Sequence, residues 1–152
     1  MTACQDGRVA QPMGDGLYLI DTGYVRPGLA ASHLVVDQGR AAFVDTGPGP
    51  AAPRLLAALD ELGLAREQVD YLFLTHVHLD HAGGAGQMMQ ALPNAKAVLH
   101  PRGAPHLVDP SKLIAGTIAV YGDAAYHQLY GELLPIPADR VLLMADGMRL
   151  QL

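Results

Sequence analysis

The sequence predicts an α/β fold. Short apolar runs of strand length alternate along the chain with segments whose apolar residues recur at helical spacing. Half of the 152 residues are hydrophobic and only 16% are charged, so the chain can bury a core and is not expected to be disordered. This length is typical of one domain, and we expect a single domain over residues 1–152.

The N-terminal part is expected to form an antiparallel meander. Strands are predicted at residues 17–20, 33–36 and 41–44, and the polar stretch 37–40 is a turn signal between the last two. The run Gly-Pro-Gly-Pro at 47–50 then breaks the sheet and opens a helix. The helix is indicated by apolar residues at helical spacing and by the stop signal Gly63; these apolar residues are Ala51, Leu55, Leu59 and Leu62.

A second strand–helix unit follows. Residues 69–75 are predicted to be a buried strand, and a helix is expected from about Gly84 to Leu92. Further elements are a strand ending at His100, a helix from Pro110 to Tyr121, and a helix capped by Asp123 that runs to Leu133. Tyrosines 121, 126 and 130 are expected to pack in the core or at its rim. The Asp-Gly pair at 146–147 predicts a hairpin with strands 141–144 and 148–152.

The loop between the strand 69–75 and the helix that follows it has the composition of a metal site. Three imidazoles and one carboxylate occur within six residues; they are His76, His78, Asp80 and His81. His76 and His78 leave extended backbone on the same side and can share one cation, while Asp80 and His81 can face a second position. A lone histidine is usually a structural group, but so dense a cluster beside an apolar strand is unfavourable unless something binds it. Nitrogen and carboxylate ligands suit zinc, and iron or manganese less exclusively.

This pattern, His-X-His-X-Asp-His followed by Gly-Gly, resembles the signature of the metallo-β-lactamase-fold hydrolases. The segment from Phe43 to Gly47 and the segment 97–104 resemble the family's flanking strand ends. The resemblance implies an αββα sandwich, of which this chain supplies the first αβ half, with two zinc ions per complete site. It implies that His76 and His78 hold the first metal and that Asp80 and His81 hold the second.

The resemblance also implies two roles for carboxylates. Asp80 would also orient the attacking nucleophile when only one metal is present. Asp45 would hydrogen-bond a metal ligand from behind and fix its orientation. A turn-forming aspartate before Thr46 and Gly47 is an equally good interpretation of Asp45.

The family completes its site with a third histidine for the first metal, a bridging aspartate and a last histidine. No segment of this chain resembles the part of the fold that supplies them, so we expect a domain truncated before its C-terminal half. The remaining candidates are expected to be structural or surface groups; they are His33, His100, His106 and His127.

The implied reaction is hydrolysis of an ester, thioester or lactone through a metal-activated hydroxide. Within the family, a mononuclear iron persulfide dioxygenase is an alternative. The alternative outside enzymology is a catalytically incompetent half-domain that exposes an apolar sheet face, and that forms a homo-oligomer or associates with its missing second half.

We expect a small-molecule substrate and no nucleic-acid or membrane partner. The net charge of −5 gives no basic footprint for nucleic acid, and no apolar run reaches the length of a membrane span. The N-terminus lacks the features of a signal peptide, so a cytoplasmic location is expected. Because Cys4 is the single cysteine, the chain has no internal disulfide framework, and we expect its free thiol to have no role in function.

Overall fold

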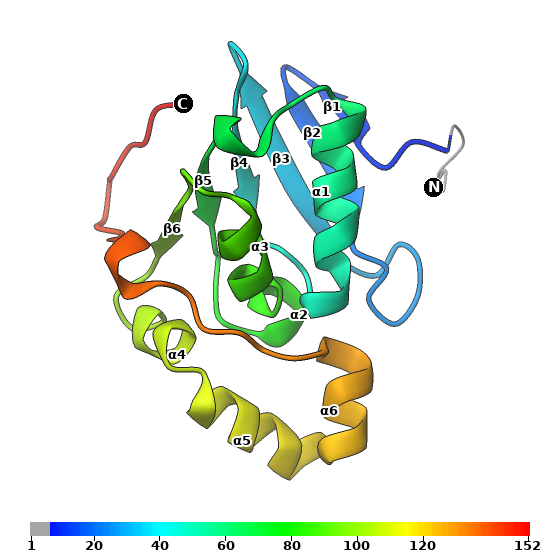
Figure 1. Cartoon of the computed structure of the whole chain (residues 1–152), viewed down its shortest axis with the longest axis vertical. Coiled ribbons are helices and arrows are strands. Elements are labelled where there is room, and N and C mark those ends of the chain that lie inside the picture. Colours follow the sequence, from blue (N-terminus) through cyan, green and yellow to red (C-terminus); the bar gives the residue numbers. More distant parts are fainter. Residues whose placement is uncertain (1–6) are drawn as a thin grey trace.

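The computed structural model describes residues 7–152, which form one mixed sheet with helices packed on it (Figure 1). Cys4 lies outside the described residues. The seven strands are arranged in the sheet in the order of the sequence. Their bounds are β1 Gln11–Gly14, β2 Leu17–Asp21, β3 Ala31–Asp37, β4 Arg40–Val44, β5 Val69–Phe73, β6 Lys96–Leu99 and β7 Val141–Leu143.

The sheet changes from antiparallel to parallel at β4. Strands β1 to β4 pair antiparallel, as the predicted meander requires, and β4 to β7 pair parallel. The β3–β4 connection is a two-residue turn in which Gln38 and Gly39 both have positive φ, 46° and 78°. Two left-handed residues match the twist of a tight hairpin, which explains why the polar stretch turns here.

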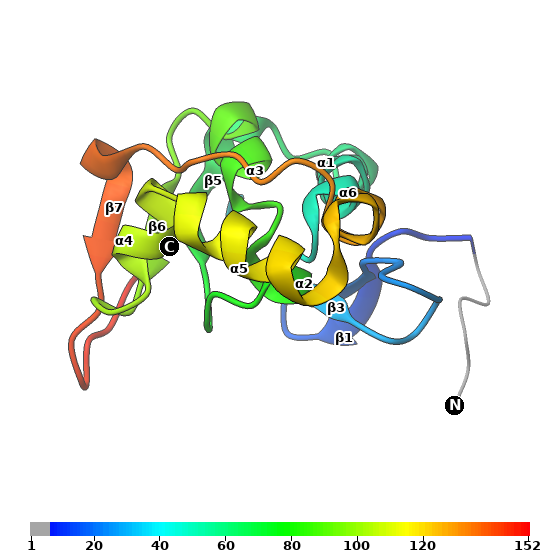
Figure 2. The ribbon, with the colours of Figure 1, turned by 90° about the horizontal axis from the view of Figure 1, so that it is seen from below.

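Helices supply the parallel crossovers and cover one face of the sheet, as the view turned by 90° shows (Figure 2). The α-helices are α1 Ala52–Glu61, α2 Leu79–Ala82, α3 Ala85–Ala91, α4 Ala104–Val108, α5 Ser111–Tyr121 and α6 Asp123–Tyr130. Three short 3-10 turns are η1 Gly49–Ala51, η2 Arg66–Gln68 and η3 Ala138–Arg140. The α/β fold class is therefore confirmed.

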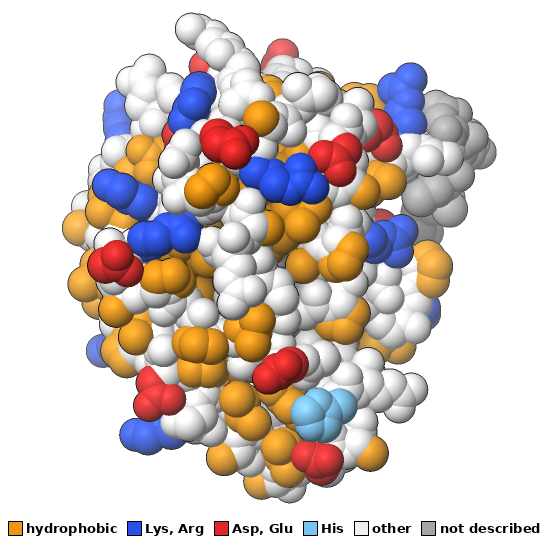
Figure 3. Space-filling view, in the orientation of Figure 1, with side chains coloured by type: hydrophobic (Ala, Val, Ile, Leu, Met, Phe, Trp, Pro, Cys, Tyr) orange, Lys and Arg blue, Asp and Glu red, His pale blue; other side chains and the backbone are white. Residues whose placement is uncertain are grey.

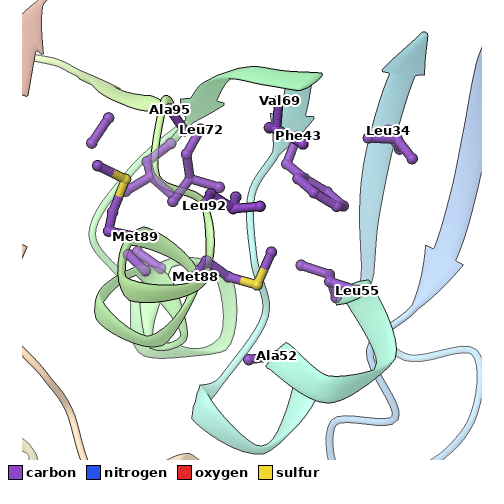
Figure 4. Packing of buried hydrophobic residues seen from close by; sticks show 14 of the residues in the cluster. Leu34, Phe43, Ala52, Leu55, Val69, Leu72, Met88, Met89, Leu92 and Ala95 are labelled. Carbon is purple, nitrogen blue, oxygen red and sulfur yellow. The ribbon is translucent and has the colours of Figure 1, made fainter. Parts of the chain in front are cut away.

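The core lies between the sheet and the helices α1 and α3 (Figure 4). One side-chain row crosses the sheet through directly paired positions of β3, β4, β5 and β6; its members are Leu34, Phe43, Leu72 and Ala97, all fully buried. Leu55 and Leu59 of α1 meet this row, as do Met88 and Met89 of α3. The helical spacing of α1 thus positions its apolar side on the sheet, as the sequence predicts.

The opposite face of the sheet carries a second row of side chains, apolar except for His33, that no helix within residues 7–152 covers. It runs through paired positions of β2 to β7; its members are Leu19, His33, Val44, Phe73, Val98 and Leu142. All but Val98 are only half-buried. Residues 144–152 pass along part of this face and leave a cavity of about 570 Å³ beside Phe73 and His100. We refer to the row as the open face.

The predicted C-terminal hairpin is wrong. β7 pairs in parallel with β6, and no strand follows it among the described residues. The Asp-Gly turn itself forms, since the Met148 N–H donates to the Ala145 carbonyl at 3.1 Å. A turn signal fixes only the local backbone, whereas strand pairing depends on the neighbouring strand, here β6. The pairing continues beyond β7, because the Met144 N–H donates to the Leu99 carbonyl at 2.8 Å.

The predicted end of the last helix, at Leu133, is also wrong. α6 begins at Asp123 and stops at Tyr130, because Gly131 has a φ of 69° and takes the chain out of the helix. The following segment is fixed by Arg140, whose guanidinium donates to the carbonyl oxygens of Met89, Leu92 and Ala95. These carbonyls lie at and just beyond the end of α3, where a positive charge is favoured.

Acidic and basic side chains are interspersed over the face seen in Figure 1, without a continuous basic area (Figure 3). Within residues 7–152, no helix combines the length and the apolar character that a membrane crossing requires.

Two helical glycines offer a matched test of the packing around α3. A Cβ at Gly86 would lie 2.3 Å from the Leu134 carbonyl oxygen, whereas a Cβ at Gly116 of α5 would meet nothing within 4 Å. We expect Gly86→Ala to lower the free energy of unfolding by about 1–3 kcal/mol through overpacking. Gly116→Ala should raise it by up to about 1 kcal/mol by reducing the entropy of the unfolded chain. Urea denaturation measures both, and an equal response of the two variants would contradict the close α3–Leu134 contact.

Candidate metal centre

The site is built where two parallel strands end at the same edge of the sheet. Asp45 directly follows β4, and Thr75 and His76 come two and three residues after Phe73, the last residue of β5. The Asp45 N–H donates to the Phe73 carbonyl at 2.8 Å, which continues the β4–β5 pairing beyond the strands. Asp45 then turns with a φ of 60°, a conformation that aspartate tolerates better than most residues. This turn brings its carboxylate to the loop that follows β5.

Asp45 is buried, with 7% of the residue exposed, and its carboxylate is surrounded by hydrogen-bond donors. Its Oδ1 accepts from the Thr75 N–H at 2.8 Å. The Thr75 hydroxyl lies 3.0 Å from Oδ1 and 2.8 Å from Oδ2. Nδ1 of His81 lies 3.1 Å from Oδ2. Asp45 therefore both forms the turn and holds two segments of the histidine loop.

Backbone hydrogen bonds fasten α2, which carries Asp80 and His81, to the segment after Asp45. The His81 carbonyl accepts from the N–H groups of Thr46 and Gly47 at 2.7 and 3.1 Å. The Gly47 carbonyl in turn accepts from the Gly84 N–H at 2.9 Å. A Cβ at Gly83 would lie 2.4 Å from the Leu79 carbonyl oxygen and 3.2 Å from Pro48 Cα. The glycines of the motif thus permit a close backbone approach behind the histidine loop.

The histidine rings converge at the loop. The ring centroids of His76 and His81 are 4.4 Å apart, and those of His76 and His78 are 4.8 Å apart. One donor atom each from Asp45, His76 and His81 lies within 4.8 Å of the others. Oδ2 of Asp80 is 3.5 Å from Nε2 of His81. Imidazole nitrogens with carboxylate oxygens are the donor set that divalent zinc takes in proteins, so these residues fit a divalent metal.

The structure brings the predicted residues to one place with different exposures. Asp45, His76 and His81 form the compact group, with His78 beside His76 and Asp80 beside His81. Asp45 is buried, His81 and Asp80 are half-buried, and His76 and His78 are exposed. The cluster is thus enclosed by protein at Asp45, and the imidazoles of His76 and His78 are accessible from solvent.

Three of the other histidines have contacts outside this cluster. His33 is half-buried on the open face, and the Nδ1 of His100 accepts from the Arg102 N–H at 3.1 Å. His127 is exposed, and its Nε2 lies 3.6 Å from Asp123. Sequence reasoning missed Thr75, whose hydroxyl contacts both Asp45 and His76 Nδ1, the latter at 2.9 Å. Its position, one residue before the motif at the end of a strand, was the available signal.

A tyrosine cluster packs behind α2. Leu79 is buried with Tyr126, Tyr130 and Leu133, so the predicted packing role of two of the tyrosines agrees with the structure. The hydroxyl of Tyr130 lies 3.0 Å from that of Tyr24, and their rings stack with centroids 5.8 Å apart. Burial, this hydrogen bond and the nearby Asp80 charge all raise the pKa of Tyr130, so its hydroxyl stays protonated at neutral pH.

Comparison with known sequences shows similarity to a protein family and to named hydrolases. The sequence profile of the Metallo-beta-lactamase superfamily matches residues 25–149. The hydroxyacylglutathione hydrolase of Salmonella paratyphi A is 37% identical over 94 residues, which are 59% of this chain and 34% of that protein. The corresponding enzyme of Salmonella typhi is 36% identical over 94 residues, with the same coverage. The match thus spans about a third of the length of these curated relatives.

Solved structures show the same fold. The subclass B3 metallo-beta-lactamase MEM-A1, isolated from a soil metagenome library, matches with a TM-score of 0.67 and 21% identity over 97% of this chain and 50% of that one. The metallo-beta-lactamase SMB-1 matches with a TM-score of 0.69 and 19% identity over 95% of this chain and 49% of that one. The chain spans about half the length of each. With its sequence matched from residue 25 to residue 149 and its fold shared with these enzymes, the chain belongs to the metallo-beta-lactamase superfamily.

Proposed function

We propose that this protein is a metal-dependent hydrolase, with zinc as the metal, that acts on a small-molecule ester, thioester or lactone. The observation that carries the proposal is the convergence of His76, His78, Asp80 and His81 beside the buried Asp45 carboxylate, at the carboxyl edge of the sheet. Family membership supports it, because the superfamily implies a divalent metal. The site is accessible on its histidine side, as a hydrolytic site must be.

The residues receive separate roles. We assign His76 and His78 to a first metal and Asp80 and His81 to a second, with iron or manganese as alternatives to zinc. A bound zinc supplies Lewis acidity and a water activated for attack near neutral pH. With only the first metal bound, Asp80 would accept a hydrogen bond from the attacking water and so orient it. Asp45 fixes His81 through Nδ1 and leaves Nε2 of that ring available, which is the usual task of a carboxylate behind a metal-bound histidine.

A thioester is the member of the substrate class that the relatives favour. The Salmonella relatives carry the name hydroxyacylglutathione hydrolase. Their match covers 59% of this chain, which is too long a stretch to leave out the histidine loop, residues 76–81. The net charge of −5 weighs against phosphodiesters of nucleic acids. A cytoplasmic setting belongs to the same proposal and rests on the sequence alone.

We further propose that a second sheet layer covers the open face and completes the site. The open face is a row over six strands in which every side chain but His33 is apolar, and large uncovered apolar surfaces mark contact sites. The matched structures align with nearly all of this chain over only half of their own length, so they contain a further portion of similar size. The occupant we infer is a polypeptide layer with an apolar sheet face that carries additional histidine and aspartate ligands.

Removal of the two exposed imidazoles should abolish metal binding. We expect the double variant His76→Ala, His78→Ala to lose high-affinity zinc binding. The remaining imidazole of His81 and the carboxylates would leave too few nitrogen ligands for the first metal. Isothermal titration with zinc measures this loss. The matched control is His127→Ala, an exposed histidine on α6 outside the cluster, which should bind zinc like the unmodified protein. Equal zinc binding by the double variant would contradict the assignment of the first metal.

Activity should depend on metal. A hydroxyacyl thioester of glutathione, a simple aryl ester and a lactone, each followed by release of thiol or acid, test the three substrate types. We expect turnover of at least one, its loss on treatment with a chelator, and its return with zinc. Turnover that survives complete chelation would contradict the proposed chemistry, as would a zinc-loaded protein that hydrolyses none of the three.

The open face should govern association of the 152-residue chain. We expect the chain to self-associate or to bind an apolar dye through this face, and Val44→Lys, which places a charge in the middle of the row, to suppress both. Val120→Lys is the control, since Val120 is 75% exposed on α5, away from the sheet. Light scattering and dye fluorescence measure the two effects. A monodisperse monomer that binds no dye would argue against a covering layer.

A further inference from the structure

The hydroxyl of Thr75 connects two residues of the metal centre. Its Oγ1 lies 2.8 Å from Oδ2 of Asp45 on one side and 2.9 Å from Nδ1 of His76 on the other. Thr75 also donates its backbone N–H to Oδ1 of Asp45 at 2.8 Å, so its position relative to the carboxylate is fixed at two points. The side chain therefore stays beside both groups.

Counting hydrogens gives the direction of these bonds. An ionised carboxylate only accepts, whereas a hydroxyl has a single hydrogen to donate. The Thr75 hydroxyl must therefore donate to Asp45, and its oxygen can only accept from the ring of His76. Nδ1 of His76 then carries the proton, and its Nε2 keeps a free lone pair.

The same count applies to His81. Its Nδ1 lies 3.1 Å from Oδ2 of Asp45 and can only donate to it, so in the neutral ring Nε2, which lies 3.5 Å from Oδ2 of Asp80, carries no proton. One buried carboxylate thus sets the tautomer of two histidines, directly for His81 and through Thr75 for His76. The tautomer that results is the one in which Nε2 of both rings can bind a cation.

We propose that Thr75 is a positioning residue that relays a hydrogen bond from His76 Nδ1 to Asp45 and thereby holds Nε2 of His76 ready for the metal. That the relay serves metal binding rests on the proposed metal-dependent function. The relay itself is inferred from hydrogen bonds within the chain. Thr75 does not bind the metal in this proposal.

The test uses two substitutions that differ in one group. Thr75→Val removes the hydroxyl and keeps the β-branched shape, and Thr75→Ser keeps the hydroxyl and removes a methyl group. Thr75 is exposed, so neither change empties the core. The first readout is the His76 tautomer in the chelator-treated protein, from long-range nitrogen–proton NMR at about pH 8, above the ordinary histidine pKa of about 6.5.

We expect His76 to be protonated on Nδ1 in the unmodified protein and in Thr75→Ser, and to become a mixture of tautomers in Thr75→Val. Zinc affinity, measured by competition with a chelator, should fall about 10- to 100-fold in Thr75→Val and change little in Thr75→Ser. A purely structural role of Thr75 would alter thermal stability and leave the tautomer unchanged.

Two results would overturn the proposal. One is a His76 proton on Nε2 in the unmodified metal-free protein, which needs no variant to detect. The other is a Thr75→Val protein with an unchanged tautomer and unchanged zinc affinity. Because the tautomer is read without metal and without substrate, an absence of hydrolysis would contradict the proposed function and not the relay.

Discussion

The parallel pairing of β4 with β5 is the constraint on which the rest of this structure depends. It ends two strands at one edge and sets Asp45 against Phe73, with the Asp45 N–H bonded to the carbonyl of that residue. From there the left-handed φ of Asp45 directs a carboxylate into the next loop. Burial of a carboxylate is unfavourable without partners, and Thr75 and His81 supply them. The histidine loop is therefore organised around Asp45 by contacts within the chain.

This organisation explains why the loop holds so many polar groups beside a core. α2 is only one turn long and would not be stable as an isolated helix. Its Leu79 packs into the tyrosine cluster, and its His81 carbonyl accepts hydrogen bonds from the N–H groups of Thr46 and Gly47. Asp80 and His81 thus sit on a turn anchored at both faces. Anchoring of this kind is what a binding site requires, because loosely held ligands lose affinity.

The sequence predicted those elements whose evidence is local. The helical spacing of Leu55 and Leu59, the turn at Gln38 and Gly39, and the density of the His-X-His-X-Asp-His run all depend on neighbouring residues, and each has its counterpart in the structure. β1 was missed because Gln11–Gly14 contains proline and glycine and is mostly exposed, so it pairs without an apolar pattern.

The features that escaped prediction depend on residues distant in sequence. Arg140 bonds carbonyls that lie 45 to 51 residues earlier, and no spacing rule indicates that contact. The false C-terminal hairpin has the same origin, since β7 finds its partner in β6, some forty residues back, and not in the segment after its turn. The Asp45–Thr75 bond spans 30 residues and is intermediate: the motif indicates the histidines, but only the parallel sheet brings the carboxylate to them.

The two faces of the sheet differ in a way that bears on the metal centre. On the helix side the row from Leu34 to Ala97 is closed, and Asp45, at the end of β4, is buried. On the other side Val44 and Phe73, each next to or near a residue of the site, are half-buried members of the open face. The protein thus encloses the donors from one direction and leaves His76 and His78 accessible. Under the proposed function, a group that completes the coordination would approach from this accessible side. The proposed covering layer would meet the sheet through Val44 and Phe73, which lie next to Asp45 and near Thr75 in the chain.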